Sequence, residues 1–258
     1  MKFSILIVTY NSEAYLRDTL NSIISQSFKD YEVVLKDAGS SDETVDIFNE
    51  YMSQSSKFRI VQKKDTGLAD AMNQAASEAK GDYIIYLHSD DIFNSSDCLS
   101  SLSSVIENNS DVKWGFGFYK YIDASGNVFK EDNLSTFISF KSHLLRNIVR
   151  HQSAFVSRSV FNELQFSEKY RFAMDYDFFL RLWEAHEPVV VREHISRFRV
   201  SGTNLSSDYY ASISDEYDVR KAWRKERGGS KLLHVFDFFV YYARIFKLRF
   251  IHGKKRRK

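Results

Sequence analysis

Residues 65–91, DTGLADAMNQAASEAKGDYIIYLHSDD, decide how the rest of the chain is read. Within them, residues 82–87 have the length and the β-branched and aromatic content of a buried strand. Asp90 and Asp91 follow at once, and adjacent carboxylates at the carboxyl end of a strand repel each other unless a cation compensates. Open α/β sheets also place their ligands at this end. The alternative is a solvated turn before a helix that Ser96 or Asp97 could equally cap.

Strand and helix patterns alternate through the first hundred residues. Nearly continuous apolar runs predict strands, and apolar residues at helical spacing predict helices between them, with Gly67 opening a helix over about 68–79. This alternation indicates βαβ units and therefore an α/β fold with a mostly parallel central sheet flanked by helices. The strands predicted here are 3–10, 31–36, 58–62 and 82–87.

The pattern after residue 100 is less regular. A turn at 123–127 joins two strands as a hairpin, and a helix covers 176–183. We expect one compact domain over 1–205, with a nucleotide-binding half (1–100) and an acceptor half (101–205), followed by a helical extension (206–258). Beyond the hairpin and that helix, this part is predicted to hold a helix at 99–106 and strands at 114–121, 128–130, 153–156 and 189–192.

Composition limits the class of protein. The 258 residues are 43% hydrophobic and 27% charged, which is typical of a globular chain. Basic and acidic residues nearly cancel, 36 against 34, so bulk charge does not indicate nucleic-acid binding. The single cysteine, Cys98, fits a reducing compartment. A strand that starts at Phe3 leaves no room for a signal peptide, and no apolar run is long enough to span a membrane, so we expect a cytoplasmic protein.

Carboxylates follow several of the predicted strands. In a parallel sheet these strand ends share one edge, so the acids are expected to converge on one crevice. Such a set suits a ribose, a base edge and a metal that bridges a diphosphate. Neither the glycine-rich dinucleotide fingerprint nor a Walker-type loop follows the first strand, which excludes those two modes of nucleotide binding. The acids concerned are Asp37, Asp65 with Asp70, and Asp90 with Asp91.

A set of short motifs runs in order along the chain: 4–11 (SILIVTYN), 37–42 (DAGSSD), 65–67 (DTG), 70–73 (DAMN), 89–91 (SDD), 151–153 (HQS), 175–181 (DYDFFLR) and 202–206 (GTNLS). In this order they resemble the family 2 glycosyltransferases, which are inverting enzymes with the GT-A fold. The resemblance covers about the first 205 residues, and it is strongest to the subgroup that builds bacterial O-antigen, capsule and exopolysaccharide.

The resemblance implies a role for each matching residue. Asp90 corresponds to the carboxylate near the ribose and diphosphate, and Asp91 to the one that holds Mg²⁺ or Mn²⁺. Asp175 corresponds to the general base, and His151 with Gln152 to a pair that faces the acceptor or the diphosphate. Residues matching the lining of the nucleotide pocket are Thr9, Tyr10, Asn11, Asp37, Asp65 and Asp70.

Several of these residues have simpler alternative roles. Asp175 could cap the helix that follows it, His151 could be a core histidine, and Asp70 could be a surface helix residue. The sequence also departs from the family pattern: Ala38 stands where glycine is usual, so the loop must avoid left-handed geometry there. Other departures are His88 for asparagine, Ala69 for a larger residue and Met174 for an acid.

The C-terminal stretch 235–251 is rich in aromatic and aliphatic residues. On a helical wheel Asp237, Arg244 and Lys247 share one side and leave a broad apolar face. Together with the basic run 254–258, this indicates a segment lying on an anionic membrane surface; the alternative is a helix that packs on the domain before a solvated basic end. Nothing else in the chain suggests a nucleic-acid partner.

The expected function is transfer of a sugar from a nucleotide-sugar, most simply a UDP-sugar, to a lipid-linked saccharide at the inner face of the cell membrane. The resemblance implies that this acceptor is a polyprenyl-diphosphate-linked saccharide. A nucleotidyltransferase on a similar fold is disfavoured, since no glycine-rich loop bearing Arg and Lys follows the first strand. A non-catalytic sugar-nucleotide-binding scaffold is the third possibility.

Overall fold

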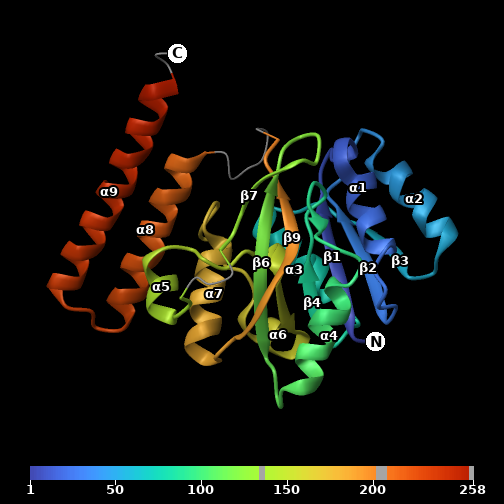
Figure 1. Cartoon of the computed structure of the whole chain (residues 1–258), viewed down its shortest axis with the longest axis horizontal. Coiled ribbons are helices and arrows are strands. Elements are labelled where there is room, and N and C mark those ends of the chain that lie inside the picture. Colours follow the sequence, from blue (N-terminus) through green and yellow to red (C-terminus); the bar gives the residue numbers. More distant parts are fainter. Residues whose placement is uncertain (134–136, 202–207, 256–258) are drawn as a thin grey trace.

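The computed structural model describes residues 1–133, 137–201 and 208–255 (Figure 1). Its centre is one mixed sheet with the strand order β3-β2-β1-β4-β8-β6-β9-β5, and β7 pairs with β6 outside this path. The strands are β1 (Phe3–Thr9), β2 (Tyr31–Asp37), β3 (Phe58–Gln62), β4 (Tyr83–Tyr86), β5 (Ile92–Phe93), β6 (Trp114–Ile122), β7 (Val128–Glu131), β8 (Ala154–Ser157) and β9 (Val189–Arg199).

Helices cover both faces of this sheet (Figure 1). Leu6 and Val8 of β1 pack into one core cluster, whereas Ile5 and Ile7 pack into another, because successive side chains of a strand point to opposite faces. Burial on both faces explains the nearly continuous apolar runs. The helices are α1 (Glu13–Ile24), α2 (Thr44–Gln54), α3 (Leu68–Ser77), α4 (Cys98–Asn108), α5 (Phe140–Leu145), α6 (Arg158–Leu164), α7 (Met174–Ala185), α8 (Tyr209–Glu226) and α9 (Lys231–Lys255), with a 3₁₀ turn η1 (His151–Ser153).

The two predicted halves of the domain share this sheet. β8 lies antiparallel between β4 and β6, and β6 runs parallel to β9. β5 directly follows Asp90 and Asp91, which we call the acidic turn. It crosses to the far edge of the sheet and pairs with β9. A glycine is needed where these strands meet, because a Cβ on Gly115 would lie 2.5 Å from the carbonyl oxygen of Val189.

This topology brings particular strand ends to one edge. β1, β2, β3 and β4 are parallel, and β6 and β9 run in the same direction because each is related to β4 through the antiparallel β8. The carboxyl ends of all six strands therefore lie at the same edge as the amino end of β8. Thr9, Asp37, Asp90, Gln152 and Arg199 come to this edge from five different parts of the chain.

Helices α8 and α9 form an antiparallel hairpin beside α5 and α7 (Figure 1). Val219 of α8 packs with Tyr176 and Leu180 of α7, which fastens the hairpin to the domain. None of the helices in the described part of the chain is both long enough and apolar enough to cross a membrane.

The predicted fold class is confirmed: the sheet is flanked by helices and followed by a helical extension. Every predicted strand and helix is present, with ends shifted by a few residues. Several findings differ from the prediction. Helices α5 and α6 and the turn η1 were not predicted. β9 continues to Arg199 instead of ending near Arg192, and the two-residue strand β5 was not predicted because so short a segment has no periodicity. The resemblance in 202–206 lies outside the described residues.

Candidate active site

The loop after β2 is organised by the carboxylate of Asp37. Its Oδ1 accepts hydrogen bonds of 2.8 Å from the backbone N–H groups of Gly39 and Ser40, and its Oδ2 accepts one of 2.8 Å from Thr9 Oγ1. Burial by itself would raise the pKa of Asp37, but the hydrogen bonds from Ser40, Thr9 and Gly39 outweigh burial and lower it. The left-handed residue of this loop is Gly39, with φ 99°, so Ala38 avoids that geometry as predicted.

Asp65 and Asp70 lie beside this loop, on either side of Gly67. Asp65 forms an ion pair with Lys36, whose side chain is fully buried at the end of β2. Asp70, in the first turn of α3, accepts hydrogen bonds of 2.9 Å from Thr66 N and from Gln74 Nε2. The first turn of α3, including Asp70, lines a cavity of about 470 Å³.

The adjacent acids at the end of β4 have different surroundings. Asp91 is 0% exposed, and both of its carboxylate oxygens are engaged: Oδ1 accepts from Arg199 N at 2.9 Å and Oδ2 from Gln152 Nε2 at 3.1 Å. Asp90 remains partly exposed at the crevice. Burial raises the pKa of both groups, and the charge of Asp90 raises that of Asp91 further. The turn does not cap α4, which begins at Cys98 after Asp97.

Asp175 stands across the crevice at the start of α7. Because α7 begins at Met174 after Ala173, Asp175 is not the cap of this helix. Its Oδ1 accepts from Asn147 Nδ2 at 3.1 Å, and its Oδ2 lies 3.4 Å from His151 Nδ1. Burial would raise the pKa of Asp175, but the hydrogen bonds from His151 and Tyr176 N, with the charge of the nearby Arg150, outweigh burial and lower it. The carboxylate is therefore ionised at neutral pH.

Two neighbouring residues of the turn η1 connect these acids. His151 contacts Asp175, while Gln152 donates to Asp91. The Nε2 atom of His151 is buried and has no hydrogen-bond partner among the described residues. The ring of His88 meets the ring of His151 edge-on, with 4.5 Å between centroids, and burial lowers the pKa of His88 to about 3. His88 is therefore a neutral imidazole at neutral pH.

This donor set can be tested against the predicted divalent cation. Asp90, neutral His88 and the unpartnered Nε2 of His151 supply an oxygen and imidazole nitrogens of the kinds such ions take. In the part of the chain that the structure describes, however, no three His, Cys, Asp or Glu residues are placed to hold an ion by themselves. The residues fit a cation whose remaining ligands come from a bound diphosphate, and they do not fit a closed protein cage.

Arg199 is a site residue that the sequence did not single out firmly. Its side chain is 1% exposed and donates to Asp90 O at 2.9 Å, to Ala124 O at 3.0 Å and to Asp18 Oδ2 at 2.9 Å. It thus joins α1, the acidic turn and the β6–β7 turn. The only local signal was an arginine near the end of a strand, because its partners lie far away in the sequence.

The remaining predicted residues lie at the rim of the crevice. Tyr10 is 66% exposed and free to stack on a planar ring. Asn11, in the left-handed region with φ 49°, accepts a hydrogen bond of 2.9 Å from Ser41 N and so closes the β1 end onto the Asp37 loop. The predicted acids therefore converge at one edge, as expected from parallel strands.

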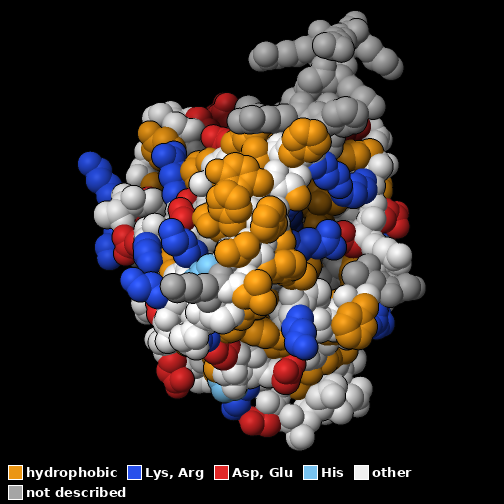
Figure 2. Space-filling view, turned by 90° about the vertical axis from the view of Figure 1, so that its left-hand side faces the viewer, with side chains coloured by type: hydrophobic (Ala, Val, Ile, Leu, Met, Phe, Trp, Pro, Cys, Tyr) orange, Lys and Arg blue, Asp and Glu red, His pale blue; other side chains and the backbone are white. Residues whose placement is uncertain are grey.

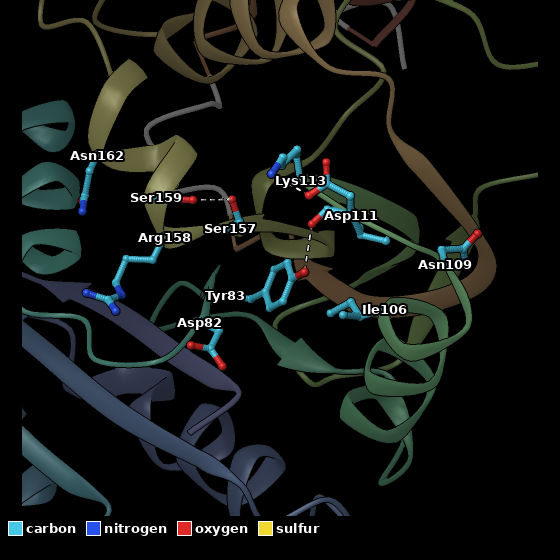
Figure 3. A pocket seen from close by; sticks show the side chains of 11 residues that line it. Asp82, Tyr83, Ile106, Asn109, Asp111, Lys113, Ser157, Arg158, Ser159 and Asn162 are labelled. Atoms are coloured by element: carbon cyan, nitrogen blue, oxygen red, sulfur yellow. Dashed lines mark hydrogen bonds and ion pairs between the residues drawn. The ribbon is translucent and has the colours of Figure 1, made fainter.

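A second cavity, of about 490 Å³, lies at the opposite edge of the sheet (Figure 3). It is bordered by the start of β4, the residues before β6 and the end of β8, where Tyr83, Lys113 and Ser157 line it. Tyr83 donates to Val112 O at 2.8 Å, and Lys113 pairs with Asp111 at 2.7 Å. Because this edge carries none of the convergent acids, the cavity is separate from the crevice.

Comparison with known proteins identifies the family of this chain. The sequence profile of Glycosyl transferase family 2 matches residues 4–164, which include the Asp37 loop, the acidic turn and the His151–Gln152 pair. The chain belongs to this family. A PGL/p-HBAD biosynthesis glycosyltransferase of Mycobacterium tuberculosis is 31% identical over 238 residues, covering 90% of this chain and 88% of the relative. An uncharacterized glycosyltransferase of Haemophilus influenzae is 27% identical over 242 residues, with coverage of 92% and 94%.

Solved structures show the same fold. S. aureus TarS 1-349 in complex with UDP-GlcNAc superposes with a TM-score of 0.73 at 20% identity, covering 95% of this chain and 72% of TarS 1-349. The mannosyltransferase PcManGT of Pyrobaculum calidifontis, in complex with GDP-Man and Mn²⁺, has a TM-score of 0.66 at 14% identity, with coverage of 94% and 73%. In another TarS 1-349 structure the chain spans 65% of that fragment.

This family 2 member is therefore a nucleotide-sugar-dependent glycosyltransferase with the GT-A fold. The expected enzyme class is confirmed. Because the chain belongs to this family, the two alternative functions, nucleotidyltransferase and non-catalytic scaffold, are no longer needed to explain the sequence.

Proposed function

We propose that the enzyme moves a sugar from a UDP-sugar to a hydroxyl of a polyprenyl-diphosphate-linked saccharide during synthesis of a bacterial surface polysaccharide such as O-antigen, with inversion at the anomeric carbon. The observation that carries the catalytic part is the pairing of His151 with Asp175 and of Gln152 with Asp91. These contacts hold an ionised base and the acidic turn on facing sides of one crevice. The C-terminal helices would keep the enzyme at the inner face of the membrane.

Asp175 is the general base of this proposal. Its carboxylate is ionised. Asn147 and the backbone N–H of Tyr176 donate to Oδ1, whereas Oδ2, beside His151, retains a lone pair for the acceptor hydroxyl. As the hydroxyl attacks from the face opposite the leaving diphosphate, Asp175 takes its proton. One base suffices, since no covalent glycosyl-enzyme intermediate has to be formed and hydrolysed.

In this proposal the nucleotide-sugar donor binds at the ends of β1 and β2, opposite Asp175. Asp37, with Thr9 and the neighbouring Tyr10 and Asn11, would receive the nucleoside, with Asp65 held nearby by Lys36 and Asp70 lining a cavity. His151 and Gln152 line the boundary between donor diphosphate and acceptor. A divalent cation, Mg²⁺ or Mn²⁺, when bound at the acidic turn neutralises the charge that develops on the leaving diphosphate.

The geometry favours Asp90 for that ion, which exchanges the roles suggested by the sequence. Asp91 is 0% exposed and each of its oxygens already accepts a hydrogen bond, from Arg199 N and from Gln152, so it presents no accessible oxygen to an ion. Asp90, in contrast, is partly exposed. In this proposal Asp91 instead fixes β9 and η1 to the acidic turn.

The test is hydrolysis and binding across UDP-, GDP- and dTDP-sugars, with and without Mn²⁺, on the wild type and the matched variants Asp90→Asn and Asp91→Asn. We expect metal-dependent release of UDP by the wild type and a loss of about 100-fold or more in Asp90→Asn with unchanged thermal stability. Asp91→Asn should keep its metal dependence and lose stability. Activity that is indifferent to metal and to Asp90, or loss of metal dependence in Asp91→Asn alone, would refute the assignment.

A further inference from the structure

Helix α9 turns its polar side toward the protein. Asp237 is 1% exposed and pairs with two arginines of α8: its Oδ1 lies 3.2 Å from Arg224 Nη2 and 3.8 Å from Arg220 Nε. Farther along the hairpin, Arg244 of α9 pairs with Glu216 of α8. Rotating α9 about its axis would leave these buried charges without partners, which is costly. The ion pairs therefore fix which side of α9 faces outward.

The outward side of α9 is apolar. Its residues recur every three or four positions and are exposed by 50–77%, which is unusual for large apolar side chains. From Leu232 to Phe246 they extend over about 21 Å, at a rise of about 1.5 Å per residue. Figure 2 shows hydrophobic side chains gathered in a band on this side of the molecule. We call these residues the outer stripe: Leu232, Val235, Phe239, Tyr242 and Phe246.

The charged residues near the outer stripe indicate which kind of partner binds it. Asp237 is the only acidic residue in the sequence of α9, and it is turned inward. Lys247 is exposed next to the stripe, and five basic residues, 254–258, follow in the sequence. A second copy of this chain would present the same cations and no carboxylate from α9 to pair with them. An anionic lipid surface offers apolar depth for the stripe and negative charge for the cations.

We propose that the outer stripe is a membrane-docking surface, with α9 lying in the interface of an anionic bilayer. The polar side of α9 packs on the protein, so α9 is also a helix that packs on the domain. α8 packs on α7, whose first turn holds the proposed base Asp175, so docking would hold that end of the crevice near the lipid surface. The inference extends the proposed function without depending on the donor.

Vesicle co-sedimentation of the full-length protein tests this surface. The vesicles are phosphatidylcholine alone or mixed with phosphatidylglycerol, and the test variant is Phe239→Ser with Phe246→Ser. Phe129→Ser on β7 is the matched control, because Phe129 is 59% exposed and lies outside the C-terminal hairpin. We expect binding to the anionic vesicles, about a tenfold or greater fall in the partition coefficient of the double variant, and no change in the control. Binding to neutral vesicles should be about tenfold weaker.

Three outcomes would overturn the proposal: no binding of the wild type to anionic vesicles, equal binding by the double variant, or a wild-type dimer in solution that the double variant converts to a monomer without any vesicle binding. The last would identify a second copy as the partner. Donor hydrolysis measured without vesicles separates these outcomes from a failure of the proposed transfer reaction, because the stripe lies outside the crevice.

Discussion

Asp237→Ala should release α9 from the body of the protein. The substitution removes the carboxylate that pairs with Arg224 and Arg220, whose side chains are only 8% and 0% exposed. Arg224 has no other ion pair among the described residues. Arg220 keeps a hydrogen bond of 3.2 Å to Leu145 O and a distant contact, 3.9 Å, with Glu216. One buried guanidinium is thus left without compensation and a second is only partly compensated.

The expected loss of stability follows from the two buried arginines that lose their shared carboxylate. Removing one partner of a buried ion pair destabilises by about 3–5 kcal/mol, and the remaining contacts of Arg220 place this case near 3 kcal/mol. Because α9 touches the domain through α8, the cost falls on local opening of the hairpin. At about 1.36 kcal/mol per factor of ten, amide protection in α9 should fall by about 150-fold.

Hydrogen exchange read by mass spectrometry on peptides from residues 231–248 measures this change directly. Asp218→Ala, on an exposed position of α8, is the control and should stay within about 0.5 kcal/mol of the wild type. Peptides from β1 and β2 should exchange as before in both variants. Protection of α9 within threefold of the wild type in Asp237→Ala would refute the view that this ion cluster orients the helix.

Three further predictions concern the crevice and the sheet. Asp175→Asn should lower sugar transfer by about 100- to 10,000-fold while the donor dissociation constant, measured by calorimetry, stays unchanged; a parallel loss of donor binding would contradict its role as base. Because the folded pKa of Asp37 is lowered, its ionised form stabilises the protein above the unfolded pKa of about 3.9, and this contribution disappears as pH falls through the folded pKa. In urea unfolding, Asp37→Asn should therefore cost about 1–3 kcal/mol at pH 7 and less at pH 3, and an equal cost at both would argue against the shift. Gly115→Ala should cost about 1–3 kcal/mol in thermal unfolding, since its Cβ would lie 2.5 Å from Val189 O; an unchanged melting temperature would show that β6 and β9 can separate at no cost.

The first half of the chain was predictable because its signals are local. Apolar runs gave the strands, helical spacing gave the helices, and parallel strands bring Asp37, Asp65 and Asp90 to one edge without further information. The length of β9 was not predictable in this way. Residues 193–199 are only partly apolar, and they become a strand because β6 and β5 pair with them on both sides.

The division of roles between Asp90 and Asp91 also depends on distant partners. Local sequence shows two equivalent carboxylates, and only the approach of Arg199 N and Gln152 Nε2 makes one of them a buried acceptor. The orientation of helix α9 likewise depends on residues far away in the sequence. A helical wheel found the polar side around Asp237, but which side faces the protein was decided by Arg220 and Arg224 on another helix.

The bond between Asp91 and Arg199 N has a consequence for biosynthesis. A nascent chain that has emerged through β5 already contains the Asp37 loop and the acidic turn, yet Arg199, which donates to Asp91, lies 108 residues after Asp91 in the sequence. The edge of the sheet is also incomplete before β9 is made, because β5 pairs with β9. A ribosome-bound fragment lacking β9 would therefore carry the donor-binding acids in an unfinished arrangement. Catalytic competence arrives late in translation, when one strand secures both walls of the crevice.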